Sequence, residues 1–322
     1  MSGIYDGERA AGLDFGHLPV LPREVCGFLN FGATEAKLID GTVGNGGHSS
    51  RLALANPAAR LLCIDRDEAA LRRAAERLEF ARGRVEFAHG EFAELDDIAR
   101  AHGFDGADGV LLDIGVSSPQ LDDASRGFSW RGDGPLDMRM DRSCGITAAE
   151  MLNRYDEPAL AGIFAEYGEL HSARKLAAAV VRRRKERPFE RTCELAEFCE
   201  SELGRTAPGK LPLPTLVFQA LRIAVNDELG QLERGLRAAL KVLRPGGVMV
   251  VISFHSLEDR IVKNFMRNAA ADCVCPPGLP VCVCGKVREV EVLTRKVVMA
   301  QPDELAENRR SAPARLRAAR KI

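Results

Sequence analysis

Short apolar runs alternate with helical patterns along the chain, and this alternation constrains the fold more than any other feature. Strand-like runs occupy residues 36–40, 60–65, 85–88, 109–113 and 247–253. The last two are apolar almost throughout, as is typical of strands that are covered on both faces. An amphipathic helix is predicted from Asp67 to about Phe80. Strands and helices in this order predict an α/β fold built on a mostly parallel sheet.

More than 130 residues separate the fourth and fifth of these runs, far more than one crossover needs. Residues 213–243 carry a helical stripe and are predicted to be the crossover helix. Residues 124–209 contain helical patterns only, and they predict an inserted helical domain for substrate recognition. The core is then discontinuous, comprising residues 1–123 and 210–322. Within it, residues 287–300 alternate in a way that predicts a terminal hairpin.

The amino-acid composition of the chain argues against some functional classes. The chain has 45 basic and 46 acidic residues and a net charge of −1, which argues against a wholly cationic nucleic-acid wrapper. Basic tracts at 182–187 and 309–321 nevertheless predict local contacts with RNA phosphates; solvated helix faces are the alternative. The longest apolar runs are far shorter than the roughly 20 residues of a membrane helix. Nine cysteines without a signal-type N-terminus predict reduced thiols and a cytoplasmic protein that does not bind membranes.

A glycine-rich loop follows the first strand, with the sequence Asp-Gly-Thr-Val-Gly-Asn-Gly-Gly-His at 40–48. Glycines allow the backbone to turn tightly and to approach a ligand. Asp65 ends the next strand 21 residues after Gly44, where a carboxylate can accept both hydroxyls of a ribose. Ser49 replaces the third glycine of a dinucleotide clamp, which disfavours a nicotinamide dehydrogenase. Asp40 would repel phosphates but suits the amino group and sulfonium of S-adenosylmethionine; a purely structural turn is the alternative.

A second loop, residues 113–120, leaves the carboxyl end of the fourth strand, the edge where open α/β sheets bind ligands. Methyl transfer to an exocyclic amine needs acceptors that hold the amine hydrogens, because the lone pair is delocalised into the base. Ser118-Pro119-Gln120 is similar to the start of the (Asp/Asn/Ser)-Pro-Pro-aromatic segment of amino-methyltransferases, but it lacks the second proline and the aromatic residue. The alternative is a proline-stiffened loop without chemistry.

Six strings together closely resemble the bacterial RsmH (MraW) family of S-adenosylmethionine-dependent methyltransferases, which act on N4 of a cytidine in 16S rRNA. The strings lie at 40–49, 113–123, 126–129, 134–141, 218–226 and 253–260. Those at 134–141 (Gly-Pro-Leu-Asp-Met-Arg-Met-Asp) and 253–260 (Ser-Phe-His-Ser-Leu-Glu-Asp-Arg) are the most specific. The resemblance extends from about His17 to the basic C-terminus.

The resemblance implies a class I (Rossmann-like) methyltransferase core, with a mostly parallel seven-stranded sheet and an inserted small helical domain. It also implies 16S rRNA, within the 30S subunit, as the partner, and the decoding-region cytidine conventionally numbered 1402 as the target. Carried over position by position, it assigns cofactor contacts to Gly46, Gly47 and His48 at the methionine part, Asp65 at the ribose, Phe92 at the adenine, and Asp113 and Gln120 elsewhere in the pocket.

Three residues are candidates for handling the target amine. The resemblance makes Asp137, in the 134–141 string, a candidate acceptor on the substrate side. Ser118 is a second acceptor, and His255, just after the fifth strand, is expected to position the base or to accept a proton. A hydrogen-bonded structural histidine is the alternative for His255. The product ammonium is acidic, so no strong general base is required.

Four cysteines form a Cys-x-Cys…Cys-x-Cys array, Cys273, Cys275, Cys282 and Cys284. Four thiolates can close a tetrahedral zinc site and fix a loop that has little other structure. Free reduced thiols are the alternative, and any metal here is expected to be structural.

Two rival functions remain at this stage. One is an amino-methyltransferase for another nucleic acid, such as DNA. The other is a non-catalytic ribosome-assembly or RNA-binding factor that retains the fold. Retention of S-adenosylmethionine and the methylation pattern of rRNA discriminate between them.

Overall fold

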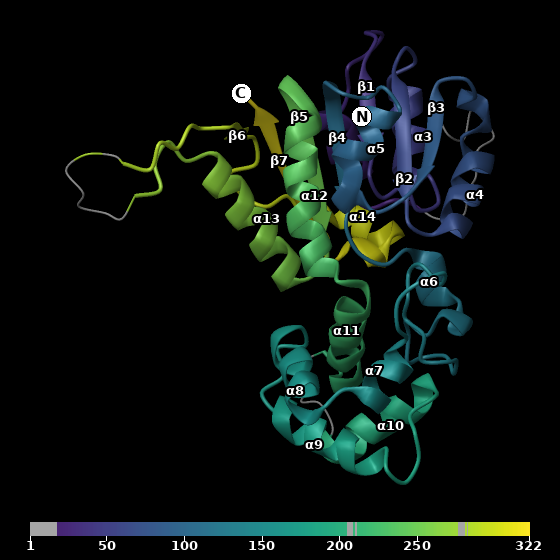
Figure 1. The fold of residues 1–322 in the computed structure, drawn as a ribbon. Coiled ribbons are helices and arrows are strands. Elements are labelled where there is room, and N and C mark those ends of the chain that lie inside the picture. The colour runs from purple at the N-terminus through teal and green to yellow at the C-terminus, as the bar shows by residue number, and fades with distance from the viewer. Residues whose placement is uncertain (1–17, 205–208, 210, 276–280, 282) are drawn as a thin grey trace. The chain divides into compact units, whose positions relative to one another are not determined.

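The computed structural model describes residues 18–204, 209, 211–275, 281 and 283–322, and these residues form two compact units (Figure 1). Unit 1 comprises Met1–Gly115 and Gly230–Ile322, and unit 2 comprises Val116–Leu229. Unit 2 extends beyond the predicted insertion, 124–209, on both sides. Each unit is described by itself below.

Unit 1 is built on a seven-stranded sheet with the strand order β3-β2-β1-β4-β5-β7-β6. The strands are β1 (Lys37–Asp40), β2 (Arg60–Asp65), β3 (Val85–His89), β4 (Ala107–Asp113), β5 (Leu243–Ser253), β6 (Val290–Val292) and β7 (Arg315–Lys321). β1 to β5 are parallel, whereas β7 is antiparallel to both β5 and β6. The predicted α/β fold with a mostly parallel seven-stranded sheet is confirmed.

The central strands alternate their side chains between two hydrophobic clusters. In β4, Val110 and Leu112 belong to one cluster and Leu111 to the other. In β2, Leu62 and Ile64 likewise face away from Leu61. A sheet whose strands are buried on both faces needs such apolar runs, which explains the sequence pattern.

Helices contribute to both clusters. The first cluster takes residues from α5 (Leu95–Ala101), α12 (Glu228–Val242) and α13 (Ser256–Ala269), and the second from α2 (Pro22–Phe28), α3 (Gly47–Ala55) and α4 (Glu68–Arg77). A short helix, α14 (Pro302–Glu307), precedes β7. Within the described residues, no helix is long and apolar enough to cross a lipid bilayer.

Unit 2 is helical and has its own core. Its helices are α6 (Ser118–Asp122), α7 (Ala148–Arg154), α8 (Glu157–Glu166), α9 (Ala173–Arg183), α10 (Thr192–Leu203) and α11 (Leu213–Asn226). One cluster of buried side chains joins α7 to α11, with Phe164, Leu176 and Leu221 fully buried within it.

The prediction of a single crossover helix over 213–243 was wrong. Asp227 adopts a left-handed conformation (φ 47°) and separates α11 from α12. The residues before it carry an apolar stripe of their own, including Val217 and Phe218, which packs into the core of unit 2. This packing is the reason that unit 2 extends past the predicted boundary at 209.

The predicted hairpin over 287–300 was also wrong. Only Val290–Val292 forms a strand, β6, and its partner is β7. The basic composition of residues 315–321 obscured a strand in which Leu316, Ala318 and Ala319 are buried.

Candidate functional site

Three aspartates end neighbouring strands of unit 1. Asp40 ends β1, Asp65 ends β2 and Asp113 ends β4. β1 lies between β2 and β4 in the sheet, and all three strands are parallel. The three carboxylates are therefore gathered at the carboxyl edge, where open α/β sheets bind their ligands.

The glycine loop connects β1 to α3 across this edge. Gly44 (φ 52°) and Gly46 (φ 75°) adopt left-handed conformations, which glycine reaches without steric cost. A Cβ atom at Gly46 would lie 3.3 Å from the Cα atom of Ala74, so the loop also packs closely against α4. Gly46 and Gly47 form the N-terminal end of α3, and they present backbone rather than side chains there.

The carboxylate of Asp65 is fixed by two backbone donors. The amide of Gly44 donates to Oδ2 at 2.8 Å, and the amide of Asp67 donates to Oδ1 at 2.9 Å. Burial raises the pKa of Asp65, although both hydrogen bonds act in the opposite direction. Asp65 therefore ties the glycine loop to the end of β2 and has a fixed orientation.

Asp40 is buried below the same loop. Ser49 Oγ donates to Oδ2 at 2.6 Å, and the amide of Thr42 donates to Oδ1 at 3.1 Å. Burial raises the pKa of Asp40 to about 6, although these hydrogen bonds favour the charged form. The carboxylate thus occupies a place where negative charge is poorly compensated.

The side chains of His48 and Asp113 lie close together, and each has a buried polar atom that is not hydrogen-bonded within the described residues. His48 Nε2 lies 3.6 Å from Asp113 Oδ2, too far for a strong hydrogen bond. Neither His48 Nε2 nor Asp113 Oδ1 has a hydrogen-bond partner among the described residues, and both atoms are buried. Buried polar atoms are normally paired, so these two indicate a place for a ligand.

Positive charge is scarce around these carboxylates. In the part of the chain that the structure describes, no lysine or arginine forms an ion pair with Asp40, Asp65 or Asp113. Phosphate-binding loops have the opposite character, since they surround an anion with donors. This edge is instead suited to a ligand that carries positive charge and hydroxyl groups.

Phe92 lies beside the glycine loop. Its Cβ atom would be 3.3 Å from a Cβ atom at Gly41, and its ring would be 2.3 Å from one at Gly235 in α12. The absence of side chains at both glycines gives the partly buried ring its place. This packing is structural, and contact with an adenine ring stays a prediction.

His255 follows β5 at the same edge of the sheet. Asp113 pairs with Ile252 of β5, so the residues after β4 and β5 are neighbours. His255 Nε2 lies 3.0 Å from Glu258 Oε1, and the other carboxylate oxygen of Glu258 accepts hydrogen bonds from the amides of Phe254 and His255. Glu258 therefore fixes the start of α13 and, with it, the histidine ring.

The remaining predicted site residues belong to unit 2. Ser118 is the first residue of α6, and Gln120 is buried at its N-terminal turn, where its Oε1 accepts a hydrogen bond from the amide of Ser117. Asp137 is buried and forms an ion pair with Arg139, with Nε at 2.7 Å from Oδ1 and Nη2 at 3.2 Å from Oδ2. A second arginine, Arg142, lies 3.3 Å from Oδ2.

The loop around Asp137 is tightly packed. A Cβ atom at Gly127 would lie 2.2 Å from the carbonyl oxygen of Pro135, and one at Gly134 would lie 1.8 Å from that of Ala124. Asn226 bridges the loop, donating to the carbonyl of Met138 and accepting from the amide of Met140. The structure therefore gives Asp137 a rigid position.

The two basic tracts are largely engaged in internal contacts. Arg184 donates to the carbonyls of Leu152 and Tyr155, and Arg183 pairs with Glu194. In β7, Arg317 pairs with Asp259 and Lys321 donates to the carbonyls of Lys241 and Leu243. Much of the charge that the sequence pattern assigned to RNA contacts therefore stabilises the fold.

Sequence reasoning named Asp40 and Ser49 but missed Thr42 and the hydrogen bonds that join the three residues. Asp40, Thr42 and Ser49 form one network, in which Thr42 Oγ1 also accepts a hydrogen bond from the amide of Asp113 at 2.7 Å. Their common signal is a polar residue within or beside the glycine loop, at the end of a buried strand.

The family model and the named relatives that match this chain indicate the same family. The family model described as "MraW methylase family" matches residues 14–322. A protein named ribosomal RNA small subunit methyltransferase H, from Symbiobacterium thermophilum, is 48% identical over 310 residues, covering 96% of this chain and 97% of that protein. A protein of the same name from Geobacter sulfurreducens is 48% identical over 312 residues, covering 96% of this chain and all of the relative.

Proposed function

Because this chain belongs to the MraW methylase family, we propose that it transfers the methyl group of S-adenosylmethionine to N4 of a cytidine in 16S rRNA. The target is the decoding-region cytidine conventionally numbered 1402. The observation that carries the proposal is the identity of about half the residues, over nearly the whole chain, with proteins named for methylation of small-subunit rRNA.

Unit 1 would hold the methyl donor at the carboxyl edge of its sheet. Asp65, already oriented by two amides, would accept the ribose hydroxyls. The backbone at Gly46 and Gly47 would follow the methionine part, with His48 and Asp113 supplying their unpaired polar atoms. Phe92 would pack by the adenine, and the family resemblance also assigns a cofactor contact to Gln120.

The acidic character of the edge supports this choice of ligand. S-adenosylmethionine carries a sulfonium and an amino group, and it supplies an electrophilic methyl carbon. A positive charge next to Asp40 and Asp113 would offset the cost of burying their carboxylates. S-adenosylhomocysteine lacks the sulfonium charge, so the same residues would favour its release after transfer.

The amine would be activated by hydrogen-bond acceptors rather than by a strong base. Ser118 and Asp137 would hold the hydrogens of N4 and direct its lone pair at the methyl carbon. The N–C bond forms as the C–S bond breaks, and the product ammonium loses its proton to water or to His255. Each residue would act mainly by orientation.

The RNA partner is proposed to be the assembled, or nearly assembled, 30S subunit in the cytoplasm. Arg182 and Arg187 in unit 2 have side chains that are 65% and 77% exposed, and both retain contact surface for phosphates. Phosphate contacts of this kind would make binding fall with rising salt.

The test is methylation of 30S subunits from a strain that lacks this gene. We expect purified protein and labelled S-adenosylmethionine to produce N4-methylcytidine, identified by mass spectrometry of nucleosides and located by fragmentation of the rRNA. The Asp65→Ala variant serves as the inactive control. Transfer to C5, transfer to DNA only, or unchanged rRNA from the deletion strain would each contradict the proposal. Failure to bind S-adenosylmethionine would favour a non-catalytic assembly factor.

A further inference from the structure

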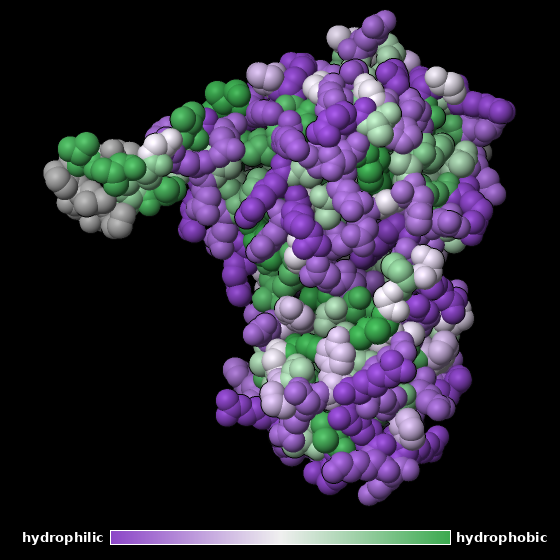
Figure 2. All heavy atoms as spheres, in the orientation of Figure 1, coloured by the Kyte–Doolittle hydropathy of each residue, from purple (hydrophilic) through white to green (hydrophobic). Residues whose placement is uncertain are grey.

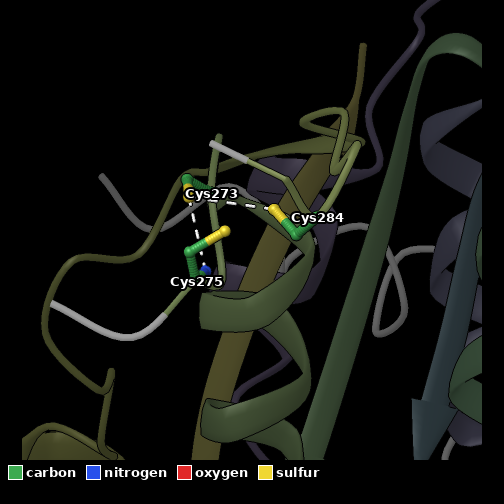
Figure 3. Close-up of side chains that lie close together, drawn as sticks. All are labelled: Cys273, Cys275 and Cys284. Carbon is green, nitrogen blue, oxygen red and sulfur yellow. Dashed lines mark hydrogen bonds between the residues drawn. The ribbon is translucent and has the colours of Figure 1, made fainter. Parts of the chain in front are cut away.

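Three cysteines of unit 1 gather between α13 and β6. The Sγ atoms of Cys273, Cys275 and Cys284 all lie within 4.8 Å of one another, and those of Cys273 and Cys284 are 3.8 Å apart. Figure 3 shows the three side chains close together, all from the irregular segment that follows α13. They lie away from the aspartates of the sheet edge in sequence and play no part in the proposed methyl transfer.

The spacing of the sulfur atoms fits one tetrahedral metal ion. Zinc–sulfur bonds of about 2.3 Å at tetrahedral angles place neighbouring sulfur atoms roughly 3.8 Å apart. A disulfide would bring two sulfur atoms to about 2.05 Å. An iron–sulfur cluster distributes its cysteines over two or more iron atoms and so needs a wider arrangement of the whole set.

Backbone amides point at each sulfur atom. The amide of Cys275 lies 3.3 Å from Cys273 Sγ, that of Val283 lies 3.4 Å from Cys275 Sγ, and that of Val274 lies 3.5 Å from Cys284 Sγ. A thiol is a weak acceptor, whereas a thiolate attracts such donors strongly. Three N–H···S contacts in one small cluster therefore favour sulfur atoms that carry negative charge.

Hydrophobic burial does not hold this segment together. The described residues from Ala271 to Glu289 form no helix or strand. Val281, Val283 and Val287 are 70%, 77% and 74% exposed, and apolar side chains are visible on the surface of this segment (Figure 2). A chain segment with these properties needs another source of order, and a bound metal supplies one.

We propose that Cys273, Cys275 and Cys284 bind one Zn²⁺ ion. Cys282, the remaining cysteine of the Cys-x-Cys…Cys-x-Cys array, lies outside the described residues. Each thiol loses a proton on binding and the metal stays divalent, so no redox partner is needed. An ion held by thiolates, with no part in the proposed methyl transfer, is structural.

The experiment measures the metal content of the full chain, purified under reducing conditions with zinc in the growth medium. We expect about one zinc per chain in the wild type, and less than about 0.1 in Cys273→Ser, Cys275→Ser and Cys284→Ser. Cys144→Ser, which alters an exposed cysteine of unit 2, is the matched control and should retain the metal.

Two further measurements test metal binding independently of the proposed methyl transfer. Chelation should expose Lys286 and Arg288 to trypsin without changing the affinity for S-adenosylmethionine. Cobalt in place of zinc should give a thiolate-to-metal charge-transfer band and the visible bands of a tetrahedral ion. Zinc-free wild type, retention of zinc by the three variants of the described cysteines, or a disulfide in the reduced preparation would overturn the proposal.

Discussion

Aspartates in the two units have opposite electrostatic surroundings. At the sheet edge of unit 1, Asp40 and Asp65 accept hydrogen bonds from amides and a hydroxyl, and burial raises the pKa of both. In unit 2, burial also opposes ionisation of Asp137, but Arg139 and Arg142 outweigh it and the pKa is lowered. Asp40 and Asp137 are both buried, and Asp65 is partly exposed, so burial alone does not explain the opposite pKa shifts; the arginines beside Asp137 do.

This difference separates a binding edge from a scaffold. A carboxylate with its own arginines is already neutralised, and the pair fixes the loop around it. A carboxylate without a cation can attract a positively charged ligand. It destabilises the protein when no ligand is bound. The first kind of residue should therefore affect folding most when it is changed, and the second kind should affect ligand affinity most.

Replacement of Asp65 tests whether the aspartates of unit 1 bind a ligand. It should have the largest effect on ligand affinity of the changes proposed here. Two hydrogen bonds from ribose hydroxyls to a charged acceptor contribute about 1.5–3 kcal/mol each. Asp65→Ala should therefore weaken binding of S-adenosylmethionine by roughly 100- to 10,000-fold, as measured by calorimetry. Methyl transfer should fall below detection.

Two other variants control this measurement. Asp65→Asn keeps an acceptor for one of the two backbone amides, and it should separate loss of ligand contacts from loss of loop order. Glu68→Gln removes an exposed carboxylate three residues away and should bind normally. Equal affinity in Asp65→Ala and the wild type would remove the basis of the proposed site.

Replacement of Asp137 tests the scaffold side. Asp137→Asn removes the charge that neutralises the partly buried Arg139, which should lower the free energy of unfolding by about 1.5–3 kcal/mol. Denaturant titration measures this value. Because the pKa of Asp137 is lowered in the folded state, its stabilisation is present at neutral pH and is lost as the pH falls through the folded pKa, below 3.8. The difference between variant and wild type should shrink over that range.

The same variant should leave S-adenosylmethionine affinity within about two-fold of wild type. Methyl transfer by Asp137→Asn should fall, and Arg139→Gln, which keeps the carboxylate, should retain more activity under conditions where both variants are folded. The exposed pair of Asp133 and Arg191 gives the control, since Asp133→Asn should change stability little. If Asp137→Asn weakened cofactor binding as much as Asp65→Ala, the distinction between the two groups would be lost.

Replacement of Asp40 should raise the stability of the free protein and weaken its affinity for S-adenosylmethionine. Its pKa of about 6 lies above the unfolded value of 3.8, so the folded state binds the proton more tightly. The contribution of Asp40 to the stability of the free protein is therefore fully present below about pH 4, and up to about 3 kcal/mol of it is lost as the pH rises through 6. Asp40→Asn should remove this pH dependence and raise the melting temperature at pH 7, while it weakens binding of S-adenosylmethionine.

Comparison of two ligands makes this prediction specific. S-adenosylhomocysteine carries no sulfonium charge, so Asp40→Asn should weaken its binding less than that of S-adenosylmethionine. Thermal shifts at pH 5 and pH 8 with each ligand provide the measurement. Ser49→Ala, which removes one hydrogen bond to the carboxylate without removing its charge, is the control. An equal loss for both ligands would show that Asp40 does not sense the charge.

The parts of the molecule that depend on local sequence were predictable. The apolar run at 247–253 and the glycine loop at 40–48 each carry a signal within a few residues, and both lie where expected. The strand β7 was missed because its charge is neutralised by distant residues, with Asp259 58 positions away from Arg317. Charge patterns alone do not reveal such partners.

In the candidate site, too, some features were predictable from local sequence and others depend on distant residues. Sequence pattern and resemblance predicted Asp65, His48 and Asp113 as site residues, and the structure places Asp65 and Asp113 at strand ends and His48 at the start of α3. The pairing of Asp137 with Arg139 is local, but its burial depends on Asn226, which bridges the loop from the end of α11. The raised pKa of Asp40 likewise depends on packing from several elements, so the contrast between the two groups of aspartates emerges only from the folded chain.

The smallest expected effect concerns the glycine loop. Gly46→Ala places a Cβ atom in a left-handed conformation, which costs roughly 1–2 kcal/mol, and within 3.3 Å of the Cα atom of Ala74. Gly32→Ala has a similar conformation (φ 61°) with nothing within 4 Å, so it isolates the conformational cost. Both variants should lose stability, Gly46→Ala slightly more. Only Gly46→Ala should weaken S-adenosylmethionine binding, because the loop next to the ligand must shift. Equal affinities would mean that the loop adjusts without disturbing the carboxylates, and that the edge of unit 1 is less finely positioned than the scaffold loop of unit 2.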